Sequence, residues 1–326
     1  MTETFKAWSI RRYGGPEELI PVERPLPQPG PGEVLIRIRA SAVTRADTMM
    51  RAGIPRFARA FLGLGRPRRD LAGTGLSGEV IALGEGVTRF GMGDEVFGET
   101  GMNFGGNASH ICLDETGTLM PKPPALNHEE AAVMCDGVLT SLNFLREIAE
   151  VRAGERVLVL GGSGSLGSAA VQIAKAMGAD VTATASARNA DLVSSLGSNR
   201  VIDYTREDFS RSTARYDVIY DTLGVSSFGE AKGALTPTGR YVCPVLSAGL
   251  LAAMLRTARF GRRKARFSAT GLQKPEALRT MLAELLAMVE AGTLRPVMDR
   301  SFPFDELVAA HRHVETGHKQ GNVTLV

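Results

Sequence analysis

The pattern of hydrophobic and polar residues changes near residue 125. Before that point, short runs rich in β-branched residues are separated by Gly and Pro, which is typical of several short strands in a small barrel or sandwich. The runs expected to form strands are Val34–Ala40, Glu79–Leu83 and Asp94–Phe97. The first third of the chain is therefore predicted to be β-rich.

Beyond three prolines at 121–124, strands and helices alternate. Asn127 has the properties of a helix N-cap, because two glutamates follow in the first turn. Such alternation implies βαβ units around a parallel sheet, and hence an α/β fold with a second domain. The predicted strands are 156–160, 180–184, 200–202, 216–220, 239–242 and 322–326, and the predicted helices are 166–177, 191–196, 276–291 and 304–315.

A glycine-rich turn joins the strand at 156–160 to the next helix. Gly161 permits a tight turn, Gly164 lets the backbone approach a pyrophosphate, and Gly167 permits close packing of helix on strand. The helix N-terminus offers N–H groups and a positive dipole end to phosphates. Three glycines can also simply build a turn. Because a strand and a helix flank these glycines as the motif requires, we predict a dinucleotide site here.

The end of the following strand indicates which dinucleotide binds. NAD sites place an acidic residue there, whereas NADP sites lack it and supply a cation. Asp180 stands at the start of this strand and Asp191 lies in the next helix, so neither occupies its end. Ser186 and Arg188 follow the strand and can contact a 2′-phosphate. We therefore favour NADPH, although a solvent-facing turn would also explain these residues.

Composition narrows the class of protein. With 326 residues, 44% of them hydrophobic and 22% charged, the chain is long enough for two folded domains. A net charge of +3 predicts no general attraction to nucleic acid or membranes. Two segments, 51–69 and 256–266, nevertheless hold six basic residues each and no acid, and the rest of the chain carries a charge of −9.

The cysteines and histidines predict no metal site or disulfide framework. Cys112, Cys135 and Cys243 are far apart and odd in number, which favours a reducing, cytoplasmic location. No signal peptide or membrane-spanning run is expected. The five histidines form no HExxH motif and no set of three convergent ligands. Ser163 does not stand in a G-x-S-x-G elbow, which argues against a hydrolase.

Motifs in a fixed order along the chain carry a family resemblance. The chain resembles the zinc-independent quinone oxidoreductases (the zeta-crystallin-like group) of the medium-chain dehydrogenase/reductase superfamily. The residues that match are Glu33–Ile36, Ala42–Asp47, Gly73–Gly78, Gly93–Gly98, Gln172–Lys175, Val201–Tyr204, Tyr216–Asp221 and Val314–Val323.

The resemblance implies a GroES-like catalytic domain at 1–125 and 295–326, interrupted by a Rossmann NADP(H)-binding domain at 126–294. It implies NADPH as cofactor and commonly a homodimer formed through the edge of the Rossmann sheet. By resemblance, three groups of residues contact NADPH: Ser163, Gly164, Ser165 and Leu166 at the pyrophosphate; Ser186 and Tyr204 near the 2′-phosphate; and Thr140, Pro244, Val245, Leu246 and Asn322 beside the nicotinamide and its ribose.

The chain differs from its zinc-dependent relatives at the positions where those relatives bind their metal. Zinc-dependent relatives carry Cys where this chain has Thr44, and a His-Glu pair where it has Thr74 and Gly75. The zinc-free relatives often have Asn at the Thr44 position and Asp at the Gly75 position, and this chain has neither. These differences account for the missing ligand set.

The expected reaction is hydride transfer to a quinone or an α,β-unsaturated carbonyl, without metal. Thr44 is the candidate donor to the carbonyl oxygen, and Asp47 either is a structural or orienting group or contacts the reacting region directly. Two alternatives are a zinc-independent alcohol dehydrogenase and an NADPH-binding protein with little or no turnover.

The basic segments leave further alternatives open. Segment 51–69 would favour an anionic substrate or form a solvated loop. Segment 256–266 would bind RNA or anionic lipid, or form a solvated helix or loop outside the sheet.

Overall fold

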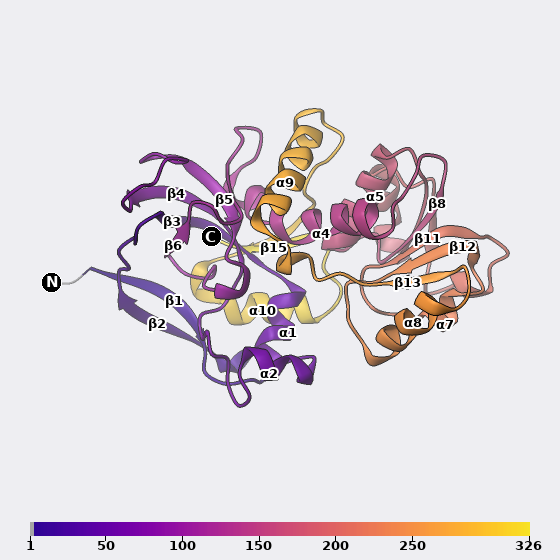
Figure 1. Ribbon diagram of the computed structural model, residues 1–326, viewed down its shortest axis with the longest axis horizontal. Helices are drawn as coiled ribbons and strands as arrows, with labels where there is room; N and C mark the ends of the chain where they lie inside the picture. Colours follow the sequence, from indigo (N-terminus) through magenta and orange to yellow (C-terminus); the bar gives the residue numbers. More distant parts are fainter. Residues whose placement is uncertain (1–2) are drawn as a thin grey trace. The chain divides into compact units, whose positions relative to one another are not determined.

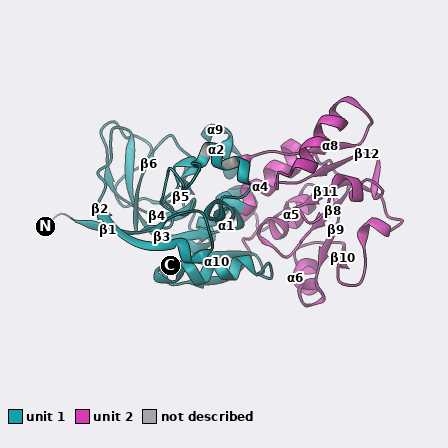
Figure 2. Ribbon diagram, turned by 90° about the horizontal axis from the view of Figure 1, so that it is seen from below, with its two compact units in different colours: residues 1–136, 271–286, 298–326 teal, residues 137–270, 287–297 magenta. Residues whose placement is uncertain are grey.

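A computed structural model describes residues 3–326, with only the backbone of Ala58 and Phe61. The chain forms two compact units (Figure 2). Unit 1 comprises residues 1–136, 271–286 and 298–326, and unit 2 comprises residues 137–270 and 287–297. The predicted domain boundaries at 125 and 295 stay a prediction. No helix among the described residues is long and apolar enough to cross a membrane.

Unit 1 is built on a seven-stranded sheet in the order β14-β15-β3-β4-β5-β7, with β6 also paired to β3, and a two-stranded sheet of β1 and β2. Strand β15, near the C-terminus, pairs antiparallel with β3, so the end of the chain returns to the first sheet (Figure 1). The strands are β1 (Thr4–Ile10), β2 (Leu19–Pro25), β3 (Glu33–Val43), β4 (Gly75–Leu83), β5 (Glu95–Glu99), β6 (His110–Asp114), β7 (Leu119–Pro121), β14 (Met298–Phe302) and β15 (Asn322–Leu325).

Hydrophobic side chains of these strands form the core of unit 1. One cluster includes Val34, Ile36, Leu76 and Val96. A second joins the sheet to the last helix through residues such as Val323 and Leu307. The helices of this unit are α1 (Arg45–Ala52), α2 (Arg59–Leu62), α3 (His128–Ala132), α9 (Pro275–Glu290), which ends in unit 2, and α10 (Leu307–Glu315).

The segment 51–69 is not the uniform basic loop that its sequence suggests. Arg51 lies on α1, is only 1% exposed, and forms an ion pair with Glu315 of α10. Arg59 lies over the ring of Tyr13, 4.6 Å from its centroid, and donates to backbone carbonyls of residues 52 and 53. The interpretation of all six arginines as a solvated or substrate-facing group is therefore wrong for at least Arg51.

Unit 2 contains a six-stranded, fully parallel sheet in the order β10-β9-β8-β11-β12-β13. Numbered from β8, this is the order 3-2-1-4-5-6 of the doubly wound dinucleotide-binding fold. The sequence predicted five of these strands and the parallel arrangement. The strands are β8 (Arg156–Leu160), β9 (Asp180–Ala185), β10 (Arg200–Asp203), β11 (Tyr216–Asp221), β12 (Leu235–Val242) and β13 (Lys264–Arg266).

Helices lie on both sides of the unit 2 sheet, with α5 on one side and α8 on the other (Figure 1). Val157, Leu158 and Val159 of β8 are fully buried, as expected for a central strand covered on both faces. Phe144 stacks on Tyr220 at 5.3 Å between ring centroids. The helices are α4 (Leu139–Leu142), α5 (Ser165–Ala176), α6 (Ala190–Ser195), α7 (Phe228–Ala231) and α8 (Ala248–Arg259), with π-helices η4 (Met134–Val138) and η5 (Asn143–Ile148) before the first strand.

The segment 256–266 also differs from its simplest interpretation. It was expected to be a solvated helix or loop outside the sheet, but Lys264–Arg266 is the edge strand β13. Arg263 donates to the carbonyls of Leu235 and Thr236, and Arg266 pairs with Glu150. The C-terminal half of this basic segment therefore has structural partners.

Candidate cofactor and active site

The glycine turn of unit 2 is held against the end of the neighbouring strand. Gly161 has φ of 83°, a conformation that favours glycine, and its N–H donates to Thr184 Oγ1 at 2.9 Å. The N–H of Gly162 donates to the carbonyl of Thr184 at 2.8 Å. The turn after β8 is therefore fixed by the last residues of β9.

The other two glycines of the motif differ in what surrounds them. A Cβ at Gly167 would lie 1.9 Å from the carbonyl oxygen of Gly161, so only glycine allows α5 to pack this closely on the turn. A Cβ at Gly164 would meet nothing nearer than that oxygen, at 3.6 Å. The protein itself therefore has no need of glycine at 164, and the space left there is what a pyrophosphate would require.

The start of α5 is suited to bind an anion. Gly164 is the N-cap residue and provides no side-chain cap. The first N–H groups of a helix have no intrahelical acceptor, and they carry the positive end of the helix dipole. Ser163 lies beside this turn, and its Oγ accepts a hydrogen bond from Nδ2 of the buried Asn189 at 3.0 Å. Asn189 orients Ser163 and was missed, because the sequence contains no motif that links the two.

The residues predicted to contact a 2′-phosphate lie at two neighbouring strand ends. Ser186 follows β9, and Arg188 is exposed on the short helix η6 (Ala187–Asn189). Tyr204 follows β10, is 58% exposed, and donates its N–H to the carbonyl of Ala185 at 3.3 Å. The structure thus places Ser186 and Tyr204 side by side.

A carboxylate at this edge, that of Asp203, accepts hydrogen bonds from a neighbouring residue. Asp203 ends β10, and its Oδ1 accepts hydrogen bonds from the N–H and the hydroxyl of Thr205 at 3.0 and 2.8 Å. These bonds lower the pKa of Asp203. The edge that would receive the adenosine ribose therefore offers hydroxyls and an arginine at the end of β9.

A buried carboxylate that sequence analysis did not single out as functional organises the other side of the turn. Asp221 ends β11, is fully buried, and accepts hydrogen bonds from the four N–H groups of residues 223–226 and from the Tyr241 hydroxyl at 2.8 Å. The Thr222 hydroxyl donates to the carbonyl of Leu160 at 2.7 Å. Asp221 and Thr222 therefore hold the 222–226 loop next to the glycine turn.

The predicted nicotinamide-side residues are divided between the units. Val245, between Pro244 and Leu246 after β12, lies against the 222–226 loop, because a Cβ at Gly224 would be 2.9 Å from its Cβ. Thr140 lies on α4, which packs on α5 through a 2.8 Å bond from the Ser141 hydroxyl to the carbonyl of Leu166. Asn322 is buried at the start of β15, which belongs to unit 1.

Thr44 and Asp47 form a capping box at the start of α1. Asp47 Oδ2 accepts from the N–H of Thr44 at 2.8 Å and from its hydroxyl at 2.7 Å, while Thr44 Oγ1 accepts from the N–H of Asp47 at 3.0 Å. Both residues are buried, and Asp47 Oδ1 has no hydrogen-bond partner within the described chain. Burial raises the pKa of Asp47 to about 7, with a smaller contribution from the nearby Asp136.

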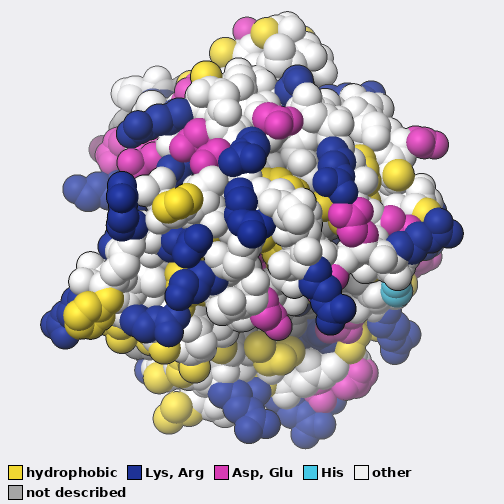
Figure 3. Space-filling view, turned by 90° about the vertical axis from the view of Figure 1, so that its right-hand side faces the viewer, with side chains coloured by type: hydrophobic (Ala, Val, Ile, Leu, Met, Phe, Trp, Pro, Cys, Tyr) yellow, Lys and Arg dark blue, Asp and Glu magenta, His cyan; other side chains and the backbone are white. Residues whose placement is uncertain are grey.

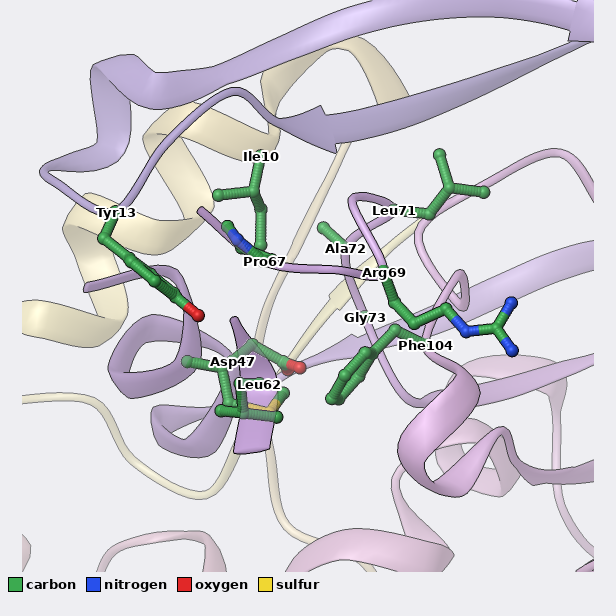
Figure 4. A pocket seen from close by; sticks show the side chains of 11 residues that line it. Ile10, Tyr13, Asp47, Leu62, Pro67, Arg69, Leu71, Ala72, Gly73 and Phe104 are labelled. Atoms are coloured by element: carbon green, nitrogen blue, oxygen red, sulfur yellow. The ribbon is translucent and has the colours of Figure 1, made fainter. Parts of the chain in front are cut away.

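Asp47 borders a largely apolar pocket in unit 1 (Figure 4). Tyr13 stands at one side, with its hydroxyl donating to the carbonyl of Gly63 at 2.8 Å. The aromatic ring of Phe104 faces Leu62 across the pocket, whereas the guanidinium of Arg69 points away. The remaining lining residues are Ile10, Met50, Pro67, Leu71, Ala72 and Gly73.

Sequence analysis did not single out three further charged residues of unit 1 whose pKa values are shifted by burial. Burial raises the pKa of Glu99 to about 7 and also raises that of Asp136. Burial lowers the pKa of Lys319 to about 8, against the opposing effect of Asp136 and Asp299. Asp136 carried a usable signal, since it is the one charged residue in the apolar run 131–145.

No group of three or more His, Cys, Asp or Glu side chains within the described part of the chain is placed to hold a metal ion. Gly75, at the position where the family resemblance led us to expect an acid in related proteins, has no room for a side chain. A Cβ there would lie 2.7 Å from the carbonyl oxygen of Ala132 and 3.1 Å from Cβ of Ala42.

The protonation of Asp47 predicts how stability depends on pH. Folded Asp47 binds its proton more tightly than in the unfolded chain, where the pKa is about 4, so the free energy of unfolding falls as the pH rises from about 4 through about 7. Urea unfolding at about pH 5 and about pH 8 should show a smaller difference for Asp47→Asn than for the wild type. Exposed Asp305→Asn is the control, and an unchanged difference in Asp47→Asn would contradict the assignment.

Comparisons with known proteins agree with this geometry. Residues 30–143 match the alcohol dehydrogenase GroES-like domain, and residues 196–325 match the zinc-binding dehydrogenase domain. A quinone oxidoreductase from Pseudomonas aeruginosa is 30% identical over 96% of this chain and 97% of its own length. An NADPH-dependent alkenal/one oxidoreductase from Arabidopsis thaliana is 28% identical over 98% and 79%, respectively.

Comparison with solved structures also finds a quinone oxidoreductase. The quinone oxidoreductase from Coxiella burnetii superposes with a TM-score of 0.87 at 29% identity, covering 99% of both chains. The GroES-like and Rossmann folds expected from the sequence are therefore confirmed. The chain belongs to the quinone oxidoreductase group of the medium-chain dehydrogenase/reductase superfamily and is an oxidoreductase that uses a nicotinamide cofactor.

Proposed function

We propose that this protein transfers a hydride from NADPH to quinones or α,β-unsaturated carbonyls without a metal ion. The observation that carries the proposal is the edge of the unit 2 sheet, where space remains at Gly164 and Ser186 and Arg188 follow β9 with no acid. The names of the two relatives, a quinone oxidoreductase and an alkenal/one oxidoreductase, support the class of acceptor.

The residues that would hold NADPH follow from this edge. Gly161 and Gly167 shape the turn, while Ser163, Gly164, Ser165 and Leu166 surround the pyrophosphate position at the start of α5. Ser186, Arg188 and Tyr204 would bind the 2′-phosphate. Thr140, Pro244, Val245, Leu246 and Asn322 would border the nicotinamide and its ribose. When bound, NADPH supplies the hydride, and the protein positions the acceptor and excludes water.

The proposal that no metal takes part rests on the side chains at the expected ligand positions. Thr44 and Thr74 offer hydroxyls where related enzymes have stronger ligands, and Gly75 has no space for an acid. A catalytic zinc requires about three convergent protein ligands. An activated alkene accepts hydride without a Lewis acid more readily than a simple alcohol gives one up, so reduction is favoured over alcohol oxidation.

The acceptor oxygen needs a proton as negative charge develops on it. We propose that Thr44 donates this proton and that protonated Asp47 replaces it. In the structure the Thr44 hydroxyl donates to Asp47 Oδ2 at 2.7 Å. Once Thr44 has given its proton to the acceptor oxygen, a proton on Oδ2 would pass to Thr44 Oγ1 along the same contact. Asp47 is left ionised, and it must regain a proton before the next turnover. Thr44 is then a catalytic residue, and Asp47 acts through it.

The test of the proposed function is NADPH oxidation in the presence of 1,4-benzoquinone, 9,10-phenanthrenequinone and an aliphatic enone. Turnover is expected with at least one acceptor class and with NADPH above NADH. Binding of NADPH without turnover of any acceptor would favour a binding protein. Oxidation of simple alcohols by NADP⁺ at a higher rate than enone reduction would favour an alcohol dehydrogenase.

Ser186→Asp tests the cofactor assignment. A carboxylate at the end of β9 would repel a 2′-phosphate, so KM for NADPH should rise about tenfold or more while KM for NADH stays the same or falls. Ser194→Asp adds the same charge on an exposed face of α6 and should change neither value. Equal weakening of both cofactors by Ser186→Asp would place the 2′-phosphate elsewhere.

Thr44→Val and Thr44→Ser test the proton donor. Removing the hydroxyl should lower kcat by about 100-fold, while Thr44→Ser should keep most of the activity because it keeps both bonds to Asp47. Loss of the N-cap costs about 1 kcal/mol, so circular dichroism must show that Thr44→Val is folded. A folded Thr44→Val with wild-type kcat would leave Thr44 as a cap only.

We also propose a homodimer formed through the outer edge of β13, which has a single neighbour, β12, in the sheet described above.

A further inference from the structure

Helix α8 has one face in the core of unit 2 and an apolar opposite face. Leu250, Ala253 and Thr257 are buried against the sheet. On the other side, Leu251 and Leu255 are 48% and 67% exposed. They are four residues apart, so they lie one above the other on the helix. Phe260, the residue at which the helix ends, is 71% exposed.

The same surface carries arginines without acidic partners. Arg256, Arg259 and Arg262 are exposed, and none of them forms an ion pair with a carboxylate of the described residues. No acidic residue occurs between Glu230 and Glu276. Arg259 and Arg262 therefore differ from the remainder of the basic segment, which binds carbonyls and Glu150. The guanidinium of Arg256 lies over the ring of Phe228, 5.9 Å from its centroid.

Apolar and cationic side chains lie on one accessible surface. In Figure 3, hydrophobic side chains gather in the lower part of the view, with Lys and Arg side chains next to them. Exposed aliphatic residues in a short stripe, flanked by arginines and ended by an aromatic residue, are typical of helices that lie in the interface of a membrane. Arginine can keep its charged group at the phosphates while its stem stays with the acyl chains.

We propose that α8 docks this protein on anionic membrane surfaces, with Leu251, Leu255 and Phe260 entering the interface and Arg256, Arg259 and Arg262 contacting lipid phosphates. Charge complementarity selects the anionic lipid. A second copy of α8 is a poor occupant, because a two-fold contact would bring the arginines of both copies together. Nucleic acid would leave two leucines without an apolar partner.

Vesicle flotation tests the proposal on the full chain. Binding is expected to vesicles of phosphatidylcholine and phosphatidylglycerol, to weaken as salt is raised, and to be absent with phosphatidylcholine alone. Each leucine replaced by asparagine should weaken partitioning about tenfold, so Leu251→Asn with Leu255→Asn should lose about 100-fold. Arg259→Gln with Arg262→Gln should lose on the order of 25-fold.

Met92→Asn is the matched control, because Met92 is 65% exposed but lies in a turn of unit 1. It should bind vesicles as the wild type does. The arginine variant changes only exposed side chains, so it decides the question if the leucine variant fails to fold, as judged by circular dichroism. Retained NADPH oxidation in either variant shows that the effect on binding is separate from the proposed activity.

Four results would overturn the proposal. The first is equal binding to vesicles with and without phosphatidylglycerol. The second is unchanged binding after both pairs of substitutions. The third is conversion of a dimer to a monomer by the leucine variant in analytical ultracentrifugation, which would assign the face to a second copy. Tighter, salt-sensitive binding to single-stranded RNA than to anionic vesicles would assign it to nucleic acid.

Discussion

The close contact between the turn after β8 and helix α5 is the constraint on which the rest of unit 2 depends. Gly167 allows the helix to approach the carbonyl of Gly161, and two hydrogen bonds to Thr184 fix the turn on β9. This approach directs the start of α5 toward the carboxyl edge of the sheet. Asp221 then orders the next loop along that edge, so the loops that carry the predicted cofactor residues of unit 2 follow neighbouring strands at one edge of the sheet.

The sequence predicted the parts of the fold that local patterns determine. Buried strands, the glycine turn and the helix that follows have a clear periodicity, and the family motifs extended this to the whole chain. Strands β1 and β2 were missed, because β2 contains Pro21 and Pro25 and pairs only at a two-stranded edge, where proline is tolerated. Helix α8 was also missed, since a Leu- and Ala-rich run next to basic residues has no single interpretation.

The sequence indicated residues expected to contact the cofactor, and those contacts stay a prediction. It did not indicate the residues that hold them in place. Ser163 and Ser186 follow from the motif, whereas Asn189 and Asp221 act through contacts that link distant positions. Thr44 and Asp47 stand three positions apart, which suits a capping box, but the pKa of Asp47 depends on burial that no local pattern reveals. For the same reason, the raised pKa of Glu99 and the lowered pKa of Lys319 became visible only in the folded unit.

The lack of room at Gly75 has a consequence for protein engineering. A designer who wished to turn this protein into a zinc enzyme would place cysteine, histidine and glutamate at positions 44, 74 and 75. The third substitution would push a side chain into the backbone of α3 at Ala132, and the cysteine would remove the capping hydroxyl that holds Asp47. A zinc site at these positions would therefore require α3 and the start of α1 to rearrange. The three substitutions alone would not create it.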